Sequence, residues 1–144
     1  MKIREILRRK GDHVVTVTPA RTVQAALRLL VEHGIGSVVV VDEGEIRGIV
    51  TERDVLRLVN RDPAASGNTL IAAMLSGEVI VAVPDDDVQY VMEVMTRNRV
   101  RHLPIVEDGQ LVGIISIGDV VNHIRRDVEA ENRYLRDYVH GLVR

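Results

Sequence analysis

The sequence predicts an α+β protein made of two copies of one β-α-β-β-α unit. Residues 14–59, the first repeat, align without a gap with residues 79–124, the second repeat, at a constant offset of sixty-five positions. Each repeat contains one apolar segment with helical spacing and three short apolar runs of strand length. The last two runs of each repeat are separated by a turn that contains glycine, which is typical of a β-hairpin.

The alignment of the repeats rests on ten identical positions, and most other pairs exchange one aliphatic residue for another. A proline, two glycines and an aspartate recur in register, and each has a specific backbone or polar role: Pro19/Pro84, Gly44/Gly109, Gly48/Gly113 and Asp54/Asp119. We therefore interpret the chain as a duplicated unit and assign the fold from the repeat.

Each repeat predicts the same five elements in the same order. A β-branched strand stops at a proline, an amphipathic helix follows, two apolar strands form a hairpin, and a second helix begins at the aspartate. In the first repeat these elements occupy 14–18, 22–33, 37–41, 46–50 and the segment after Asp54. In the second repeat they occupy 79–83, 88–98, 102–106, 111–115 and the segment from Asp119.

Three further segments lie outside the repeats. We expect a short amphipathic helix at 1–12, a linker at 63–77 with an apolar helical stretch at 70–75, and a helical tail at 126–144 that prolongs the last helix. The tail either packs within a dimer or docks another protein. We expect the two repeat domains to span 13–62 and 78–125, and all parts to form one module.

The composition excludes several classes of function. The formal net charge of −2 gives no general attraction to nucleic acid or to an anionic membrane. There is no cysteine for disulfides or thiolate chemistry, and there is no Phe or Trp on which bases would stack. No apolar run reaches the about twenty residues of a membrane span, and the basic start is not followed by the apolar part of a secretory signal. We therefore expect a cytoplasmic protein that contacts neither nucleic acid nor membrane.

Two features are reminiscent of metal ligands but fit other roles. Three consecutive aspartates at 85–87 directly precede a predicted helix, where the helix dipole favours acidic residues. Four histidines lack the paired spacing of metal ligands and are expected at the surface: His13, His33, His123 and His140. No nucleophile elbow or Walker-type loop is present in the sequence, so it predicts neither a metal site nor catalytic residues.

The two repeats share a hydroxyl residue and an aspartate at the corner between the last strand and the last helix. The corner reads Gly-Ile-Val-Thr-Glu-Arg-Asp at 48–54 and Gly-Ile-Ile-Ser-Ile-Gly-Asp at 113–119. Such a pair can cap the free N–H groups of the helix's first turn. It can also present a hydroxyl, a carboxylate and a helix N-terminus to a polar ligand. Both roles remain open from the pattern alone.

Together with the Val-Thr-Val-Thr-Pro segment at 15–19 and the Arg-His-Leu-Pro-Ile-Val segment at 101–106, these corners resemble the CBS domain, named for cystathionine β-synthase. The resemblance covers nearly the whole chain and is closest to the stand-alone tandem pairs expected in prokaryotes. It implies two units about a pseudo-twofold axis and two clefts that bind adenosine-containing ligands. It also implies dimerisation of the pair and a regulatory role.

The resemblance assigns the first cleft to residues from both repeats. In the family, the corner aspartate accepts hydrogen bonds from the ribose hydroxyls, the preceding hydroxyl touches ribose or phosphate, and nearby basic residues meet phosphate. The expected first-cleft residues are Thr51, Arg53, Asp54, Ser76, Val79, Arg101 and His102. The segment around 76–79 would cover the adenine.

The second cleft is expected to be chemically different, because glycine and serine stand where the first has arginine and histidine. Its matching residues are Lys10, Val15, Gly36, Ser37, Ser116, Gly118 and Asp119. Arginine pairs with phosphate through charge-assisted, bidentate contacts, so the first cleft is the expected site of a phosphate-bearing nucleotide. The second would be empty, hold a less charged adenosine, or hold the far half of a dinucleotide.

The expected function is a sensor that binds AMP, ADP, ATP or NAD between its repeats, with S-adenosylmethionine less favoured. We expect a homodimer that regulates an unidentified partner protein. The alternative is a structural dimerisation or docking module whose clefts are vestigial. An enzyme that acts on the bound nucleotide ranks third, because fold resemblance alone assigns no chemistry.

Overall fold

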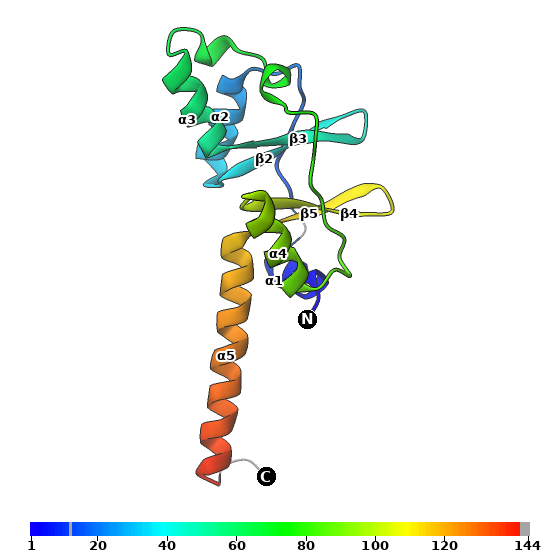
Figure 1. Ribbon diagram of the computed structural model, residues 1–144, viewed down its shortest axis with the longest axis vertical. Helices are drawn as coiled ribbons and strands as arrows, with labels where there is room; N and C mark the ends of the chain where they lie inside the picture. Colours follow the sequence, from blue (N-terminus) through cyan, green and yellow to red (C-terminus); the bar gives the residue numbers. More distant parts are fainter. Residues whose placement is uncertain (12, 142–144) are drawn as a thin grey trace.

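The computed structural model describes residues 1–11 and 13–141, and it confirms the predicted α+β class. The first repeat forms β1 (Thr16–Val17), α2 (Val23–His33), β2 (Ser37–Asp42), β3 (Glu45–Thr51) and α3 (Glu52–Arg61). The second repeat forms α4 (Val88–Asn98), β4 (His102–Glu107), β5 (Gln110–Ser116) and α5 (Ile117–Val139). The two repeats are stacked, with the β2–β3 hairpin lying next to the β4–β5 hairpin (Figure 1).

The two hairpins are antiparallel and have the same register in both repeats. Ser37 pairs with Thr51 at the open end of the first hairpin, and His102 pairs with Ser116 at the open end of the second. Each corner motif therefore lies beside the first residues of a buried central strand. This arrangement brings the polar residues of both repeats towards the middle of the molecule.

The strand predicted at the entry of each repeat is shortened, and the one at 79–83 is wrong. In the first repeat β1 is only Thr16–Val17, and in the second a single bridge joins Ala82 to Ile105. The backbone N–H of Val39 donates to Val15 O at 3.2 Å in the first repeat. Pro104 occupies the equivalent position and has no N–H, so the ladder cannot extend to residue 80.

The helical segment that precedes each repeat packs against the other repeat. Helix α1 (Ile3–Lys10) buries Ile3 and Ile6 in the core of the second repeat. The stretch predicted at 70–75 forms a short 3₁₀ helix, η2 (Ile71–Met74), which buries Ile71 in the core of the first repeat. A further 3₁₀ turn, η1 (Ser66–Asn68), lies in the linker. The chain therefore crosses between the repeats twice.

The glycines that recur before the corner motif make room for this packing. A Cβ atom added to Gly113 would lie 2.6 Å from Leu7 Cδ2, and one added to Gly48 would lie 2.7 Å from Leu75 Cδ2. Both distances are shorter than real carbon contacts, so a larger residue would push the leucine out of its place. The close approach of a leucine side chain therefore explains the glycine at this position in both repeats.

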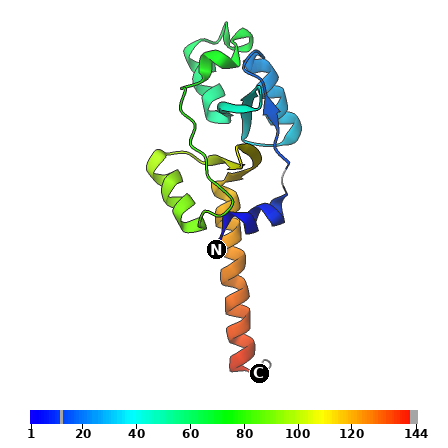
Figure 2. The same ribbon diagram turned by 90° about the vertical axis from the view of Figure 1, so that its right-hand side faces the viewer.

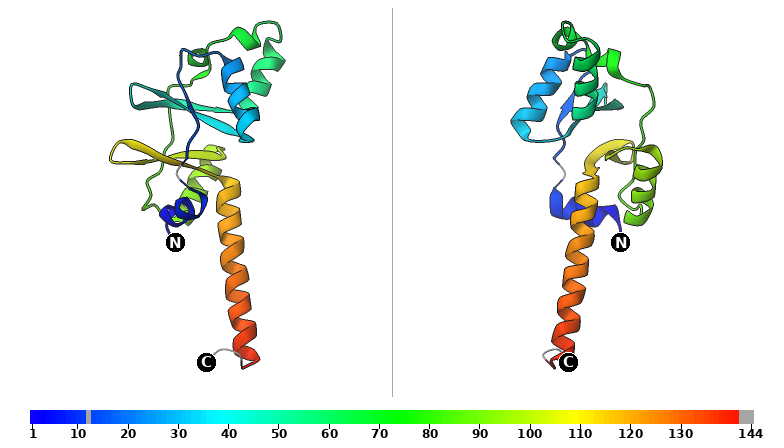
Figure 3. Two further views of the ribbon diagram at one scale, coloured as in Figure 1. Left: turned by 180° about the vertical axis from the view of Figure 1, so that it is seen from behind. Right: turned by 60° about the vertical axis from the view of Figure 1, so that its left-hand side comes forward.

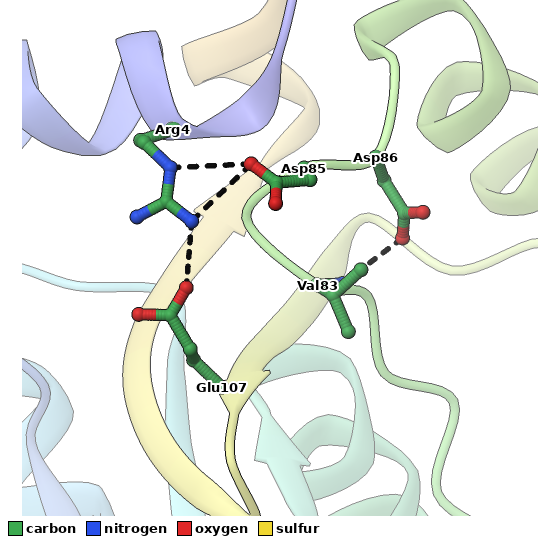
Figure 4. A network of polar contacts seen from close by, with 5 residues as sticks. All are labelled: Arg4, Val83, Asp85, Asp86 and Glu107. Carbon is green, nitrogen blue, oxygen red and sulfur yellow. Dashed lines mark hydrogen bonds and ion pairs between the residues drawn. The ribbon is translucent and has the colours of Figure 1, made fainter.

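Ion pairs fasten α1 to the second repeat (Figure 4). The Arg4 guanidinium contacts Asp85 Oδ1 at 3.2 Å and Glu107 Oε2 at 2.6 Å. Asp86 Oδ2 accepts a hydrogen bond from the backbone N–H of Val83 at 2.9 Å, in the turn before α4. Two of the three consecutive aspartates thus hold the start of α4 and the N-terminal helix in place.

Helix α5 leaves the body of the molecule as a long projecting arm (Figures 2 and 3). The tail prediction at 126–144 agrees with this helix as far as Val139, and residues 142–144 lie outside the described residues. Along the arm, Leu135 is 51% exposed and Tyr138 is 62% exposed. Among the helices of residues 1–11 and 13–141, none combines the length and apolar character needed to cross a membrane.

The expectation that His123 lies at the surface is wrong. Its side chain is buried where α5 packs against α1, and Arg9 of α1 donates a hydrogen bond to its Nδ1 atom at 3.1 Å. The i, i+3 and i+4 spacing places His123 on the same side of α5 as the buried Val120. The helix therefore carries one polar side chain on its packed face, where an arginine of α1 satisfies it in part.

Candidate functional site

A cavity of about 520 Å³ lies between the two repeats. All seven residues expected in the first cleft line it, although they come from separate parts of the chain: Thr51, Arg53, Asp54, Ser76, Val79, Arg101 and His102. The first three belong to the corner of the first repeat, and the others belong to the linker end and the second repeat. The structure therefore brings the predicted residues together, and their role towards a ligand stays a prediction.

The corner of the first repeat is a capping box that leaves one carboxylate oxygen unused. The Thr51 hydroxyl accepts a hydrogen bond from the Asp54 backbone N–H at 3.3 Å, and Asp54 Oδ2 accepts one from the Thr51 backbone N–H at 2.9 Å. The other oxygen of Asp54, Oδ1, accepts no hydrogen bond within the described part of the chain. The capping role proposed from the sequence is thus real, and it also fixes a free acceptor in the cavity.

The apolar wall of the cavity comes from the linker and the strands. Met74, Leu75, Ile80 and Ile49 all line it. Three of these four side chains are aliphatic and one is the adaptable thioether of methionine, a surface on which a flat heterocycle can pack without aromatic stacking. The lining of the cavity thus combines apolar side chains with polar and charged ones.

The cavity is lined by more arginines than the sequence analysis assigned. Arg57 and Arg99 line the cavity in addition to Arg53 and Arg101. Arg57 lies one helical turn after Arg53 on α3, and this i, i+4 spacing was a usable signal. Arg99 stands in the second repeat where the first has Gly34, a difference that only the alignment of the repeats reveals.

His102 lines the first cavity and is half-buried. Burial lowers its pKa below the ordinary value, and the nearby Lys10 lowers it further, while Glu52 and Asp119 act in the opposite direction. The imidazole of the unliganded protein is therefore neutral near pH 7. It offers a phosphate one N–H donor, and an anion bound beside it would favour the protonated ring.

The residues expected in the second cleft are only partly brought together. Lys10 Nζ donates to Asp119 Oδ2 at 2.7 Å and to Ile114 O at 2.7 Å, so the lysine of α1 covers the corner carboxylate. Ser116 forms the same capping box with Asp119 as Thr51 does with Asp54. Although burial alone raises it, the hydrogen bonds from Lys10 and Ser116 lower the pKa of Asp119 below its usual range.

The other second-cleft residues differ in burial and come from different elements. Gly36 lines the first cavity, and its carbonyl accepts a hydrogen bond from Glu52 N at 3.1 Å at the first corner. Ser37 is buried, Val15 is half-buried beside the central strand, and Gly118 is exposed on the first turn of α5. The role of these residues in a second cleft therefore stays a prediction.

Residues 3–61 and 71–126 match the family model of the CBS domain. The chain belongs to the CBS domain family. The two matched segments correspond to the two repeats, and they establish the fold as a tandem CBS pair followed by a C-terminal helix. The first match begins in α1, which precedes the first repeat in the chain but packs against the second.

Similar proteins are small CBS proteins of the same kind. The mitochondrial CBS domain-containing protein CBSX3 of Arabidopsis thaliana is 32% identical over 148 residues, which cover 96% of this chain and 72% of that protein. The crystal structure of the CBS-domain containing protein ATU1752 from Agrobacterium tumefaciens gives a TM-score of 0.82 at 40% identity, over 85% of this chain and 98% of that one.

A more distant CBS domain pair, that of protein MJ0100, was solved in complex with 5′-methylthioadenosine and S-adenosyl-L-methionine. It gives a TM-score of 0.77 at 23% identity, over 88% of this chain and 98% of that one. At this identity the likeness concerns the fold.

Proposed function

We propose that this CBS pair is a regulatory module that binds an adenine nucleotide in the first cleft and signals the bound state to a partner protein. The observation that carries the proposal is the 520 Å³ cavity, which joins a free carboxylate oxygen, an apolar wall and arginines from both repeats. Ribose hydroxyls, adenine and phosphate are the groups that these three surfaces accept.

Each part of the cavity has a counterpart in the nucleotide. The free Oδ1 of Asp54 is an acceptor for the two ribose hydroxyls. Met74, Leu75 and Val79 supply the apolar wall for the adenine. The arginines favour a phosphate-bearing ligand, which places AMP, ADP, ATP and NAD ahead of S-adenosylmethionine.

The adenosine-containing ligands of the MJ0100 pair support the choice of an adenine compound. The two ligands in that structure carry no phosphate, whereas the first cleft here is lined by four arginines: Arg53, Arg57, Arg99 and Arg101. We therefore propose that this chain binds the adenosine group that those two ligands share, and that its own ligand also carries phosphate.

Signalling would follow from the position of the cleft between the repeats. The cavity is lined by α3 of the first repeat and by the segment from Arg99 to Leu103 of the second. A ligand that contacts both parts stabilises the arrangement in which they face each other, by the difference of its affinities for that arrangement and for any other. We infer a regulatory role and no catalysis, since the Thr51 hydroxyl and the Asp54 carboxylate, 3.0 Å apart in the cavity, are both engaged in the capping box of α3.

We propose that the regulatory module works as a homodimer. Two helices carry large exposed apolar side chains: Val31 on α2 is 74% exposed and Val121 on α5 is 55% exposed. A second copy would remove these side chains from water. Sedimentation velocity at several concentrations tests the dimer.

A second candidate function is a docking or dimerisation module whose clefts are unused. The apolar residues on the exposed arm of α5 favour it, because Val128 is 49% exposed and Leu135 is 51% exposed with no described segment covering them. The two candidates differ in one requirement, since only the first needs a nucleotide.

Calorimetric titration of the purified protein with AMP, ADP, ATP, NAD and S-adenosylmethionine tests the proposal. We expect at least one nucleotide to bind, and Asp54→Ala to abolish binding. Asp119→Ala is the matched control, because it removes the same capping box from the other repeat and leaves the first cleft intact. Failure of every nucleotide to bind the folded wild type would favour the docking module. Loss of binding in Asp119→Ala alone would assign the site to the second cleft.

A further inference from the structure

The first repeat has a second groove, of about 1040 Å³, which shares no lining residue with the first cleft. The groove is lined by β1 and the turn that follows it, by one face of α2, and by Gly67 and Asn68 of η1. The first sheet has the strand order β1-β2-β3, so β1 is an edge strand. The groove therefore lies between the edge of a sheet and a helix.

The backbone of β1 has hydrogen-bonding groups that face away from β2. Thr16 pairs with Val39 in a parallel ladder, and Val39 N donates to Val15 O at 3.2 Å. In this ladder the residues on either side of Thr16 bond β2, so the N–H and C=O of Thr16 and the N–H of Thr18 point to the free side. Within residues 1–11 and 13–141 these three groups have no backbone partner, since the bond from Arg21 N uses the carbonyl of Thr18. Such an edge is a template for another strand.

The helix side of the groove is basic. Arg21 and Arg28 line it, and neither side chain forms an ion pair or a hydrogen bond within residues 1–11 and 13–141. Glu32 is the one acidic residue among those that line the groove. At the offset of sixty-five positions, the second repeat has Asp86 and Glu93 in place of the two arginines. The positive charge is therefore particular to the first repeat.

Apolar and small side chains form the rest of the lining. Val17, Leu29 and Val41 contribute aliphatic groups, and Ala25 leaves space on the helix. The second repeat has Tyr90 at the position of Ala25. A small anion would meet the arginines and leave the edge of β1 unpaired. An extended chain uses both, because its backbone pairs with a strand while its alternate side chains reach the walls of the groove.

From these observations we infer that the groove between β1 and α2 binds an extended, acidic segment of a partner protein, which adds a strand to the free edge of β1. Main-chain hydrogen bonds to Thr16 and Thr18 supply affinity, and carboxylates that pair with Arg21 and Arg28 select the segment. The inference rests on the proposed regulatory function and adds to it the kind of partner and its binding surface. Binding at this groove requires no nucleotide, because the groove and the first cleft have separate linings.

Selection of displayed random peptides on the nucleotide-free protein tests the inference. We expect the enriched peptides to be acidic, with β-branched residues between the carboxylates. The most enriched peptide is then made synthetically and titrated by calorimetry. Arg28→Glu should weaken its binding at least about tenfold. Arg97→Glu is the matched control, because it makes the same change at an exposed position of α4 that lines neither groove, and it should leave the affinity unchanged.

Two N-methylated forms of the same peptide test the added strand. One carries the methyl groups on its odd-numbered residues and the other on its even-numbered residues. A strand at the edge of β1 donates to it from alternate residues only, so one form should lose binding at least about tenfold and the other should keep it. Equal affinity of the two forms, or equal affinity of Arg28→Glu and Arg97→Glu, would overturn the inference.

Failure of the wild type to enrich acidic peptides would also overturn it. None of these results changes the calorimetric titration with nucleotides, which tests the proposed function by itself. Peptide binding without any nucleotide binding would overturn the nucleotide sensor and leave this groove in place.

Discussion

Replacing Lys10 with methionine tests whether the protein closes its second cleft with its own side chain. Lys10 Nζ lies 2.7 Å from both Asp119 Oδ2 and Ile114 O, and the two paired side chains are 31% and 25% exposed. Methionine keeps the length of the stem and removes the charge. A partly exposed ion pair with such geometry contributes about 1 kcal/mol after solvent screening, so Lys10→Met should lower the free energy of unfolding by about that amount at neutral pH.

The effect should depend on pH in a defined direction. The hydrogen bonds from Lys10 and Ser116 hold the pKa of folded Asp119 below its ordinary value, despite burial. A group whose pKa is lower in the folded state stabilises the fold above the pKa of the unfolded chain, about 3.9, and loses this effect as the pH falls through the folded pKa. The difference between wild type and Lys10→Met should therefore be complete at pH 7 and shrink below about pH 4.

Urea denaturation from pH 7 to pH 3 measures this difference. Arg8→Met is the control, because it removes a positive charge from the same last turn of α1 at an exposed position. We also expect Lys10→Met to admit adenosine to the second cleft, because the corner carboxylate loses its internal partner. An equal loss of stability in both variants, or a loss that does not change with pH, would refute the role given to Lys10.

Three further predictions concern single residues. Burial and Lys10 lower the pKa of His102, and a bound phosphate should raise it. Nucleotide binding near pH 6 should therefore take up protons, which is measured as a binding enthalpy that depends on the buffer. His102→Gln should remove this uptake. Pro104→Val should restore the missing strand donor and stabilise the fold by up to about 1 kcal/mol, with slow hydrogen exchange of the new amide. Gly113→Ala should destabilise the protein by about 1–2 kcal/mol in urea denaturation, because the methyl group displaces Leu7.

Each of these predictions has a result that contradicts it. Proton uptake that persists in His102→Gln would move its source to another group. Fast exchange of the amide in Pro104→Val would show that the proline does not limit the strand. A neutral Gly113→Ala, with Gly48→Ala destabilising, would mean that the two repeats do not use their glycines in the same way.

The order of the elements could be predicted from the sequence because the same residue pattern occurs twice in the chain. The corners at Thr51 and Ser116, the hairpins and the helices all agree with the structure. The strand expected at 79–83 failed because its side chains fit a strand, whereas its pairing needs a donor that Pro104 lacks. Strand pairing depends on the neighbouring strand, and a pattern within one segment does not contain that information.

The candidate site could be predicted where one segment supplies the residue, and less well where two segments meet. Thr51, Arg53 and Asp54 follow directly from the corner motif. Gly36 lines the first cavity, and its expected place in the second cleft stays a prediction. The hydrogen bond from Lys10 to Asp119 depends on how α1 packs against the second repeat, and no local sequence pattern shows this packing.

The most direct test of the central claim is a crystal structure of the protein grown with ATP. The account predicts density for a nucleotide in the first cleft, with the ribose hydroxyls on the free oxygen of Asp54 and the phosphates among the arginines of α3 and of the segment before β4. A nucleotide bound beside Asp119 instead would contradict the assignment of the clefts. An empty first cleft at saturating ATP would contradict the claim that this CBS pair senses an adenine nucleotide.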